Sequence, residues 1–503
     1  MGQTYKYIFM KIYDDKHIKN IVFVGAHNSG KTTLAETMLY EAGIIKRRGT
    51  IENKNTVSDY HEIEHQREAS VFATPLHTEW RNYKINIIDT PGLDDFIGEI
   101  ISSIRVSDTI TTVINAKYGV EIGTEIIWNY IDKYHKPTLF VVNQIDHEQA
   151  DFENSFNSIK QLVGNNAIKI QYPLIIDGNQ CIIDVLKMKM YKFDAQGGKP
   201  EKFSIPKEQL ETVNQLHNEL VEKAAENDEE LMELFFDKGT LNEDEMRKGI
   251  KKGMLNHDLF PVFCVSALKN MGIGRLMGFI DNVAPAASDL KPEQSLEGNE
   301  IQRNKDADPV LFVFKTTYQP NLGQITFFKV KSGEVHVNDK LINSRNGETE
   351  TINQLYIMDG KNKEPVDKLS TGDIGATTKL KFTETNDTLS TKEKGFTIKP
   401  IQYPDARITK AVFAENTKDE EKLSESLRRL QSQDPTIVLS YSKETKETLL
   451  GCQGELHLAT ITWILEHVYG VKVGFKKPKI QYRETIQRSA TANYRHKKQS
   501  GGS

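Results

Sequence analysis

The stretch Gly25-Ala26-His27-Asn28-Ser29-Gly30-Lys31-Thr32 decides the fold of this chain. It follows an apolar run at 21–24 and leads into a segment whose apolar residues have helical spacing. A strand, a glycine-bounded loop and a helix, in this order, are the context in which G-x-x-x-x-G-K-[ST] binds phosphate. The glycines let backbone N–H groups turn toward an anion, Lys31 reaches the terminal phosphates, and the Thr32 hydroxyl holds Mg²⁺. The sequence therefore predicts a nucleotide site formed by these eight residues and Thr33.

The composition limits the remaining possibilities. A chain of 503 residues is too long for one core, so about three domains are expected. The formal charge of −5 gives no overall attraction to nucleic acid, so any RNA contact must come from local patches. Cys181, Cys264 and Cys452 lie far apart without metal-ligand spacing, which is typical of core thiols in a reducing cytosol. No run approaches the roughly 18 apolar residues of a membrane span, so we expect a cytoplasmic protein without membrane contact.

Residues 20–144 alternate between apolar runs and helical patterns. The predicted strands lie at 19–24, 85–89, 109–115 and 138–143, and the predicted helices at 33–41, 96–104, 121–133 and 152–162. A last strand at 260–265 and a closing helix at 273–283 complete the pattern. Near-continuous apolar strands are typical of a sheet with both faces covered. The pattern predicts a doubly wound α/β domain over residues 1–285, with the nucleotide beyond the carboxyl ends of the strands.

Residues 164–258 break this alternation and predict an inserted subdomain. Strands are expected at 168–176 and 181–191, and one amphipathic helix at 207–235. The helix carries Glu222, Glu226, Asp228, Glu229 and Glu230. We interpret this acidic face as solvated surface.

The rest of the chain predicts a linker and two further domains. Residues 286–309 are polar and proline-punctuated, which indicates a linker. Short runs at 310–316, 323–330, 340–343, 351–358, 375–381 and 396–398, with hairpin-type turns at 346–347 and 359–360, predict an antiparallel β-barrel over 310–402. Residues 403–484 have the order βαββαβ, with helices at 421–431 and 456–468, which predicts a ferredoxin-like α+β domain. In the basic tail, 495–498 is interpreted as an unpaired edge strand.

Three strand ends supply further groups for the predicted nucleotide site. Asp89-Thr90-Pro91-Gly92 offers a carboxylate that can hold Mg²⁺ through water and a glycine N–H for a γ-phosphate. In Asn143-Gln144-Ile145-Asp146, the aspartate can accept hydrogen bonds from N1–H and N2–H₂ of guanine, which adenine does not offer. Ser266-Ala267-Leu268 ends the last strand, where a backbone N–H meets guanine O6. Together these elements predict a site for GTP or GDP with Mg²⁺.

These motifs and further stretches resemble the elongation factor G family over nearly the whole chain. The stretches lie at 85–92, 265–270, 321–328, 454–458 and 482–486, and the segment 25–40 is similar to the divergent second-paralogue class. The insertion at 164–258 is also similar to that family's, and it argues against a GTPase release factor. The resemblance implies a monomeric GTP-driven factor that contacts rRNA and ribosomal proteins near the factor-binding site. It also implies that 485–503 begin a fourth domain, truncated here, so the chain alone is not expected to move tRNAs.

The sequence departs from this family at three places. Leu93 stands where the family has the histidine that positions the attacking water, and leucine neither donates nor accepts a hydrogen bond. Asn28 replaces an aspartate of the phosphate loop. In the first switch segment, Arg67-Glu68-Ala69-Ser70 replaces Arg-Gly-Ile-Thr, which leaves Ser70 as the candidate hydroxyl for Mg²⁺ beside Thr32 and Asp89.

We therefore expect GTP binding to be retained and GTP hydrolysis to be slow. The positioning of the attacking water acts in the transition state, so its loss lowers the rate of hydrolysis without lowering the affinity for GTP. The sequence predicts a factor of the translocation step with impaired GTP hydrolysis, and no residue is assigned as catalytic. Two other functions stay open: a non-catalytic GTP-dependent regulator of ribosomes, and a GTPase release or recycling factor. A neighbouring group that replaces the missing histidine is a further alternative.

Overall fold

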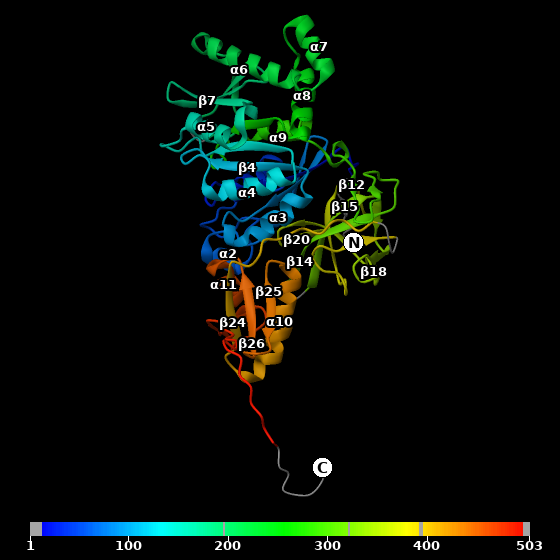
Figure 1. Ribbon diagram of the computed structural model, residues 1–503. Coiled ribbons are helices and arrows are strands. Elements are labelled where there is room, and N and C mark those ends of the chain that lie inside the picture. The colour runs from blue at the N-terminus through cyan, green and yellow to red at the C-terminus, as the bar shows by residue number, and fades with distance from the viewer. Residues whose placement is uncertain (1–12, 195–196, 320–321, 392–395, 496–503) are drawn as a thin grey trace, which may run out of the picture.

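The computed structural model describes residues 13–194, 197–319, 322–391 and 396–495. Figure 1 shows an α/β domain with its insertion at one end, a β-rich domain beside it, and a third domain below, from which the C-terminal segment extends. None of the helices in these residues combines the length and apolar character needed to cross a bilayer.

A seven-stranded sheet forms the centre of the first domain, in the order β2-β3-β1-β4-β5-β11-β6. Its strands are β1 Ile18–Val24, β2 Thr74–Trp80, β3 Tyr83–Asp89, β4 Thr109–Asn115, β5 Thr138–Asn143, β6 Ala167–Lys169 and β11 Phe260–Cys264. Its helices are α1 Lys31–Glu41, α2 Glu62–Arg67, α3 Ile97–Val106, α4 Ile122–Lys133, α5 Phe152–Val163 and α9 Ile273–Asn282. Val22 and Val24 of β1 pack in one core and Ile21 and Phe23 in another, so both faces are covered. This confirms the predicted fold class.

The edge strand β2 was not predicted. It pairs antiparallel with β3, whereas the other neighbours in this sheet are parallel. Pro75 removes one backbone donor, a loss that an edge strand tolerates. The proline and the polar residues His77 and Glu79 hid this strand from a search for apolar runs.

The two strands predicted in the insertion are each wrong as single elements. The run 168–176 divides into β6, which joins the main sheet, and β7 Gln171–Ile176, which joins a second sheet of order β10-β9-β8-β7. The run 181–191 divides because Met188 has a left-handed φ of 52° in the turn between two strands. The other strands are β8 Asn179–Asp184, β9 Lys189–Lys192 and β10 Glu201–Phe203.

The single helix predicted at 207–235 is also wrong. Asp228 accepts backbone hydrogen bonds from Glu230 and Leu231, which begins a new helix and separates α6 Lys207–Ala225 from α7 Glu229–Lys238. Asp228 is buried and pairs with Lys248 and Lys252, so it does not belong to a solvated acidic face. Both lysines lie on α8 Glu243–Asn256, a helix that was not predicted.

The second domain is an antiparallel β structure with an eight-stranded sheet, as predicted for a barrel. Its strands are β14 Val310–Gln319, β15 Gly323–Ser332, β16 Glu334–His336, β17 Lys340–Asn343, β18 Thr349–Thr351, β19 Leu355–Asp359, β20 Asn362–Val366, β21 Lys368–Ser370, β22 Ile374–Thr378 and β23 Thr388–Ser390. The predicted strand 351–358 is wrong as one element, because 352–354 separate β18 from β19. At 396–398 only Ile398 makes a bridge, to Ser295 in the segment predicted as a linker. That segment also holds β12 Glu293–Gln294 and β13 Glu300–Ile301.

The third domain has the predicted βαββαβ order, and its sheet order β25-β26-β24-β27 is ferredoxin-like. Its elements are β24 Ile408–Ala414, α10 Glu420–Gln433, β25 Val438–Ser442, β26 Glu447–Cys452, α11 Glu455–His467 and β27 Val473–Lys476. Residues 477–495 form no helix or strand, and Arg495 is the one residue of the predicted edge strand 495–498 that the structure describes. The rest of the predicted tail, 496–503, lies outside the described residues.

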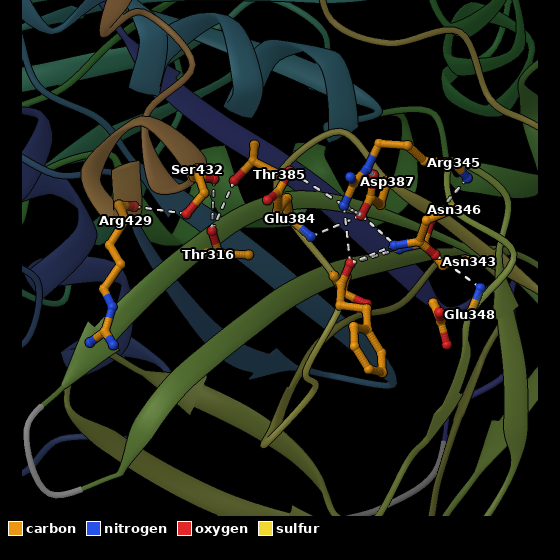
Figure 2. Close-up of polar contacts among 12 residues, drawn as sticks. Thr316, Asn343, Arg345, Asn346, Glu348, Glu384, Thr385, Asp387, Arg429 and Ser432 are labelled. Atoms are coloured by element: carbon orange, nitrogen blue, oxygen red, sulfur yellow. Dashed lines mark hydrogen bonds and ion pairs between the residues drawn. The ribbon is translucent and has the colours of Figure 1, made fainter. Parts of the chain in front are cut away.

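The barrel contacts the third domain at the end of α10, as Figure 2 shows. Thr316 of β14 donates a hydrogen bond to the Ser432 carbonyl at 3.3 Å, and Thr385 donates to the Gln433 carbonyl at 3.3 Å. Beside this contact, Asp387 accepts hydrogen bonds from Asn343 and Arg345 inside the barrel. The barrel therefore presents an ordered surface to the helix.

Candidate nucleotide-binding site

The phosphate loop connects β1 to α1 and requires both of its glycines. Gly25 and Gly30 have φ of 137° and 86°, in the region that side chains rarely adopt. A Cβ at Gly25 would lie 2.2 Å from the Val113 carbonyl oxygen, and one at Gly30 would lie 2.4 Å from Asn143 Nδ2. The loop can therefore follow this path only with glycine at both positions.

Lys31 is buried inside the loop. Its Nζ donates hydrogen bonds to the carbonyl oxygens of Gly25 at 3.0 Å and Ala26 at 2.9 Å. Burial lowers the pKa of Lys31 to about 8, against the opposing effect of the nearby Asp89 carboxylate. An anion bound in the loop would stabilise the ammonium form and raise this pKa.

The affinity for GTP should therefore depend on pH above neutrality. Below pH 8 Lys31 already carries its proton, so affinity is full; above pH 8 binding requires proton uptake, and affinity should fall about tenfold per pH unit. Calorimetric titration with GDP or GTP between pH 7 and 9 measures this slope. The control is Lys31→Arg, whose guanidinium stays protonated over this range and should give a flat profile. A flat profile for the unchanged chain would contradict the prediction.

Three predicted metal-binding groups lie together beside Lys31. The hydroxyl oxygens of Thr32 and Ser70 are 3.2 Å apart. The Asp89 carboxylate is fully buried at the end of β3, and its Oδ2 accepts a hydrogen bond from Ser58 Oγ at 2.7 Å. Burial raises the pKa of Asp89. The structure thus brings Ser70 to Thr32 although the two are far apart in the sequence.

Asp59 also belongs to this cluster and was not predicted. It is buried, and burial, followed by the charge of Asp89, raises its pKa. Both carboxylate oxygens of Asp59 and Oδ1 of Asp89 lack hydrogen-bond partners among the described residues. Unpartnered buried carboxylates beside two hydroxyls match the oxygen ligands that Mg²⁺ takes, so the residues present fit this ion. In the sequence, Asp59 is a single aspartate in a polar loop, and no spacing rule marks it as a metal ligand.

The predicted base-recognition residues meet at the ends of β5 and β11. Asn143 donates to the Ser29 carbonyl and accepts from the Ala267 N–H, each at 2.9 Å, so it joins the two loops. Gln144 donates to the Asn28 carbonyl at 2.9 Å. Asp146 is partly exposed and makes no hydrogen bond or ion pair in the part of the chain that the structure describes. Its carboxylate is therefore free to accept hydrogen bonds from a base.

The loop 266–268 is held from behind by groups that the sequence did not reveal. Ser266 Oγ accepts the Lys269 N–H at 3.1 Å, whereas the Leu268 side chain is largely exposed. Arg48 donates to the carbonyl oxygens of Ala267 and Leu268 at 3.0 and 2.8 Å. The Ser266 and Ala267 N–H groups donate to the Met271 carbonyl and to Asn143, so within the described residues it is the Leu268 N–H of this loop that is left for a ligand.

The segment after Asp89 lies against the phosphate loop. A Cβ at Gly92 would lie 2.7 Å from both His27 Cα and Lys31 Nζ, so no larger residue fits there. Leu93 follows at the N-cap of the short 3₁₀ helix 94–96 and is half-buried. His27 is exposed, yet the protein atoms around its ring still desolvate it enough to lower its pKa, with the positive charge of Lys31 as the second cause. The aliphatic side chain of Leu93 therefore occupies the position at which the family resemblance implies a histidine.

Both segments around the site reach the third domain. Asp95 Oδ2 accepts hydrogen bonds from the N–H groups of Leu456 and His457, at 2.8 and 3.2 Å, at the start of α11. A Cβ at Gly454 would lie 2.4 Å from the same oxygen, so a side chain there would push the Asp95 carboxylate away from the start of α11. At the end of α2, Arg67 donates to Thr460 Oγ1 at 2.8 Å. The predicted metal-binding cluster is therefore connected to α11 through Asp95, which follows Asp89 in the chain, and through Arg67, which precedes Ser70.

Comparisons with known families match the three folded parts of the chain. The elongation factor Tu GTP-binding domain matches residues 16–286, elongation factor G domain 2 matches 309–392, and elongation factor G domain III matches 403–477. The first of these families is a GTP-binding domain, so its match indicates that this chain binds guanine nucleotides.

Individual proteins match over almost the whole chain. An elongation factor G-like protein of Thermotoga maritima is 33% identical over 492 residues, which are 97% of this chain and 70% of the relative. Elongation factor G 2 of Desulfotalea psychrophila is 33% identical over 495 residues, 97% of this chain and 72% of the relative. A crystal structure of a Thermus thermophilus protein superimposes with a TM-score of 0.84 at 27% identity, over 92% of this chain and 68% of that one.

Proposed function

Because the chain belongs to the elongation factor G family of translational GTPases, we propose that it binds GTP with Mg²⁺ and acts in that state on the ribosome. The proposed step is translocation in protein synthesis, with slow hydrolysis of the nucleotide. One observation carries the proposal: Lys31, Thr32, Ser70 and Asp89 gather in one cluster, while Leu93 occupies the position next to Gly92. The proposed place of action is the cytoplasm, where ribosomes work.

The proposed affinity for GTP comes from groups that contact the nucleotide and Mg²⁺ before the reaction begins. Thr32 and Ser70 would bind Mg²⁺ through their hydroxyls, and Asp89 would do so through water, with the Asp59 charge nearby. When bound, Mg²⁺ neutralises charge on the phosphates. Lys31 would contact the terminal phosphates after leaving the carbonyl oxygens that it now holds. Asp146 would select guanine.

Slow hydrolysis follows from the side chain at position 93. Leucine has no polar atom with which to orient a water molecule. The nearest imidazole on the loop, His27, is exposed, and its backbone rather than its ring is the part that packs on Gly92. Positioning groups in phosphoryl transfer contribute orders of magnitude in rate, so their loss slows turnover without loosening the nucleotide.

The state of the nucleotide would reach the ribosome through the third domain. Asp95→Ala removes both hydrogen bonds to the start of α11, and hydrogen bonds to charged groups contribute about 1.5–3 kcal/mol. We expect nucleotide binding to be unchanged and GTP-dependent ribosome binding to fall at least about tenfold. Co-sedimentation with ribosomes, using a non-hydrolysable GTP analogue and GDP, measures this difference.

The matched control is Asp94→Ala, which removes the same charge one residue away. Asp94 pairs with Arg407 of the third domain, so this ion pair crosses the same boundary, but both side chains are about half exposed and such pairs contribute little. Equal losses in the two variants would refute the proposed role of the Asp95 hydrogen bonds to α11. Failure of the unchanged chain to sediment with ribosomes in any nucleotide state would refute the proposed function.

A further inference from the structure

A second group of metal-ligating side chains lies away from the nucleotide site. Asp132 is in the last turn of α4, His135 is in the turn that leads to β5, and His257 is at the C-terminal end of α8. One ligand atom from each of these residues lies within 4.8 Å of the other two. Two imidazoles and a carboxylate are ligands that zinc takes in proteins.

The ring of His257 is oriented by its surroundings. Its Nδ1 lies 3.0 Å from the Lys136 carbonyl oxygen, which can only accept, so Nδ1 carries the proton. The ring stacks on Trp128 at 5.5 Å and 16°, and packs edge-on against Phe260 at 4.9 Å. A histidine that donates one N–H to a backbone carbonyl in this way presents its other nitrogen as a metal ligand.

The second nitrogen of His257 faces an acceptor instead of a donor. Nε2 lies 3.3 Å from Asp132 Oδ1, and no hydrogen bond to it is formed within the described residues. The His257 side chain is only 8% exposed. With Nδ1 bonded to the Lys136 carbonyl, Nε2 and the Asp132 carboxylate oxygen are close enough to hold one cation together.

We infer that Asp132, His135 and His257 bind one zinc ion. Nitrogen and oxygen ligands of a tetrahedral zinc ion, about 2.0–2.2 Å from the metal, are about 3.3 Å from one another. Nε2 and Oδ1 already have this spacing, and a ligand atom of the exposed His135 lies within 4.8 Å of both. Two imidazoles favour zinc over Mg²⁺ and Ca²⁺, which prefer oxygen. Asp132 and His135 are exposed, so water supplies the fourth ligand.

The ion would connect the insertion to the main domain. α8 is the last helix of the insertion and ends beside the sheet (Figure 1), while Asp132 and His135 precede β5. A Cβ at Gly123 would lie 3.7 Å from Ala26 Cα, so α4 starts against the phosphate loop; Asp132 is in its last turn, so the zinc site lies at the other end of that helix. The site is therefore a structural clamp that is separate from GTP binding.

The test uses the whole untagged chain, treated with a chelator and titrated with zinc chloride in excess Mg²⁺, which occupies oxygen-lined sites. We expect one ion per chain and a rise in the melting temperature with zinc. Asp132→Asn and His135→Ala, both at exposed positions, should each weaken zinc binding about tenfold or more. Cobalt in place of zinc should give the intense visible absorption of a four-coordinate site.

The matched control is His17→Ala. His17 also pairs with an aspartate, Asp14, on the surface, but the zinc cluster does not include it. This variant should bind zinc as the unchanged chain does. Unchanged zinc affinity in both Asp132→Asn and His135→Ala, or no zinc binding by the unchanged chain, would overturn the inference.

Discussion

Leu93→His should raise ribosome-stimulated GTP hydrolysis by about 100-fold or more, the range in which a positioned acid–base group contributes. The substitution restores an imidazole directly after Gly92, whose Cα is held against the phosphate loop and Lys31. Nucleotide affinity should stay within a factor of two or so, because the side chain at 93 acts on the attacking water and not on the ground state. Phosphate release at saturating ribosomes, under single-turnover conditions, measures the effect.

Two controls make this result interpretable. His27→Ala tests whether the imidazole of the phosphate loop already serves as the replacement; we expect it to leave slow turnover unchanged. Leu93→Gln introduces a polar side chain of similar size without an imidazole, so it separates the effect of polarity from that of the ring. Robust turnover by the unchanged chain, lost on His27→Ala, would contradict the prediction and would assign the water-positioning role to His27.

Asp146→Asn should lower the affinity for GTP by about 100-fold or more, because it removes a charged acceptor of two hydrogen bonds. The same variant should gain affinity for xanthosine triphosphate, since the asparagine amide can donate to the carbonyl oxygen that replaces the guanine amino group. Asp146 has no hydrogen bond or ion pair within the described residues, so we expect the fold to be unaffected. Titration with fluorescent guanosine and xanthosine nucleotides measures both effects.

Glu148→Gln is the matched control for Asp146→Asn. It removes one negative charge two residues further along, at an exposed position. The affinity for GTP should stay as in the unchanged chain. If both variants weaken GTP binding equally, the effect is one of general charge, and the assignment of Asp146 to the guanine base is wrong.

The sequence by itself determined the fold class and the predicted phosphate and base motifs. These depend on local rules: glycines at the two left-handed positions of the loop, apolar runs for buried parallel strands, and polar residues where those strands end. The βαββαβ order of the third domain was predicted on the same basis, since each element carries its own periodicity. The roles of the predicted site residues and the domain boundaries stay predictions.

Only the tertiary structure decided which distant groups meet. Asp59 joins Asp89, Arg48 holds the loop at 266–268, and Asp95 reaches α11 across more than three hundred residues. In the same way, the chain brings His257 to Asp132 only when α8 packs against the main sheet. No local pattern encodes such pairs, because they depend on how the cores of separate elements pack together and not on neighbours along the chain.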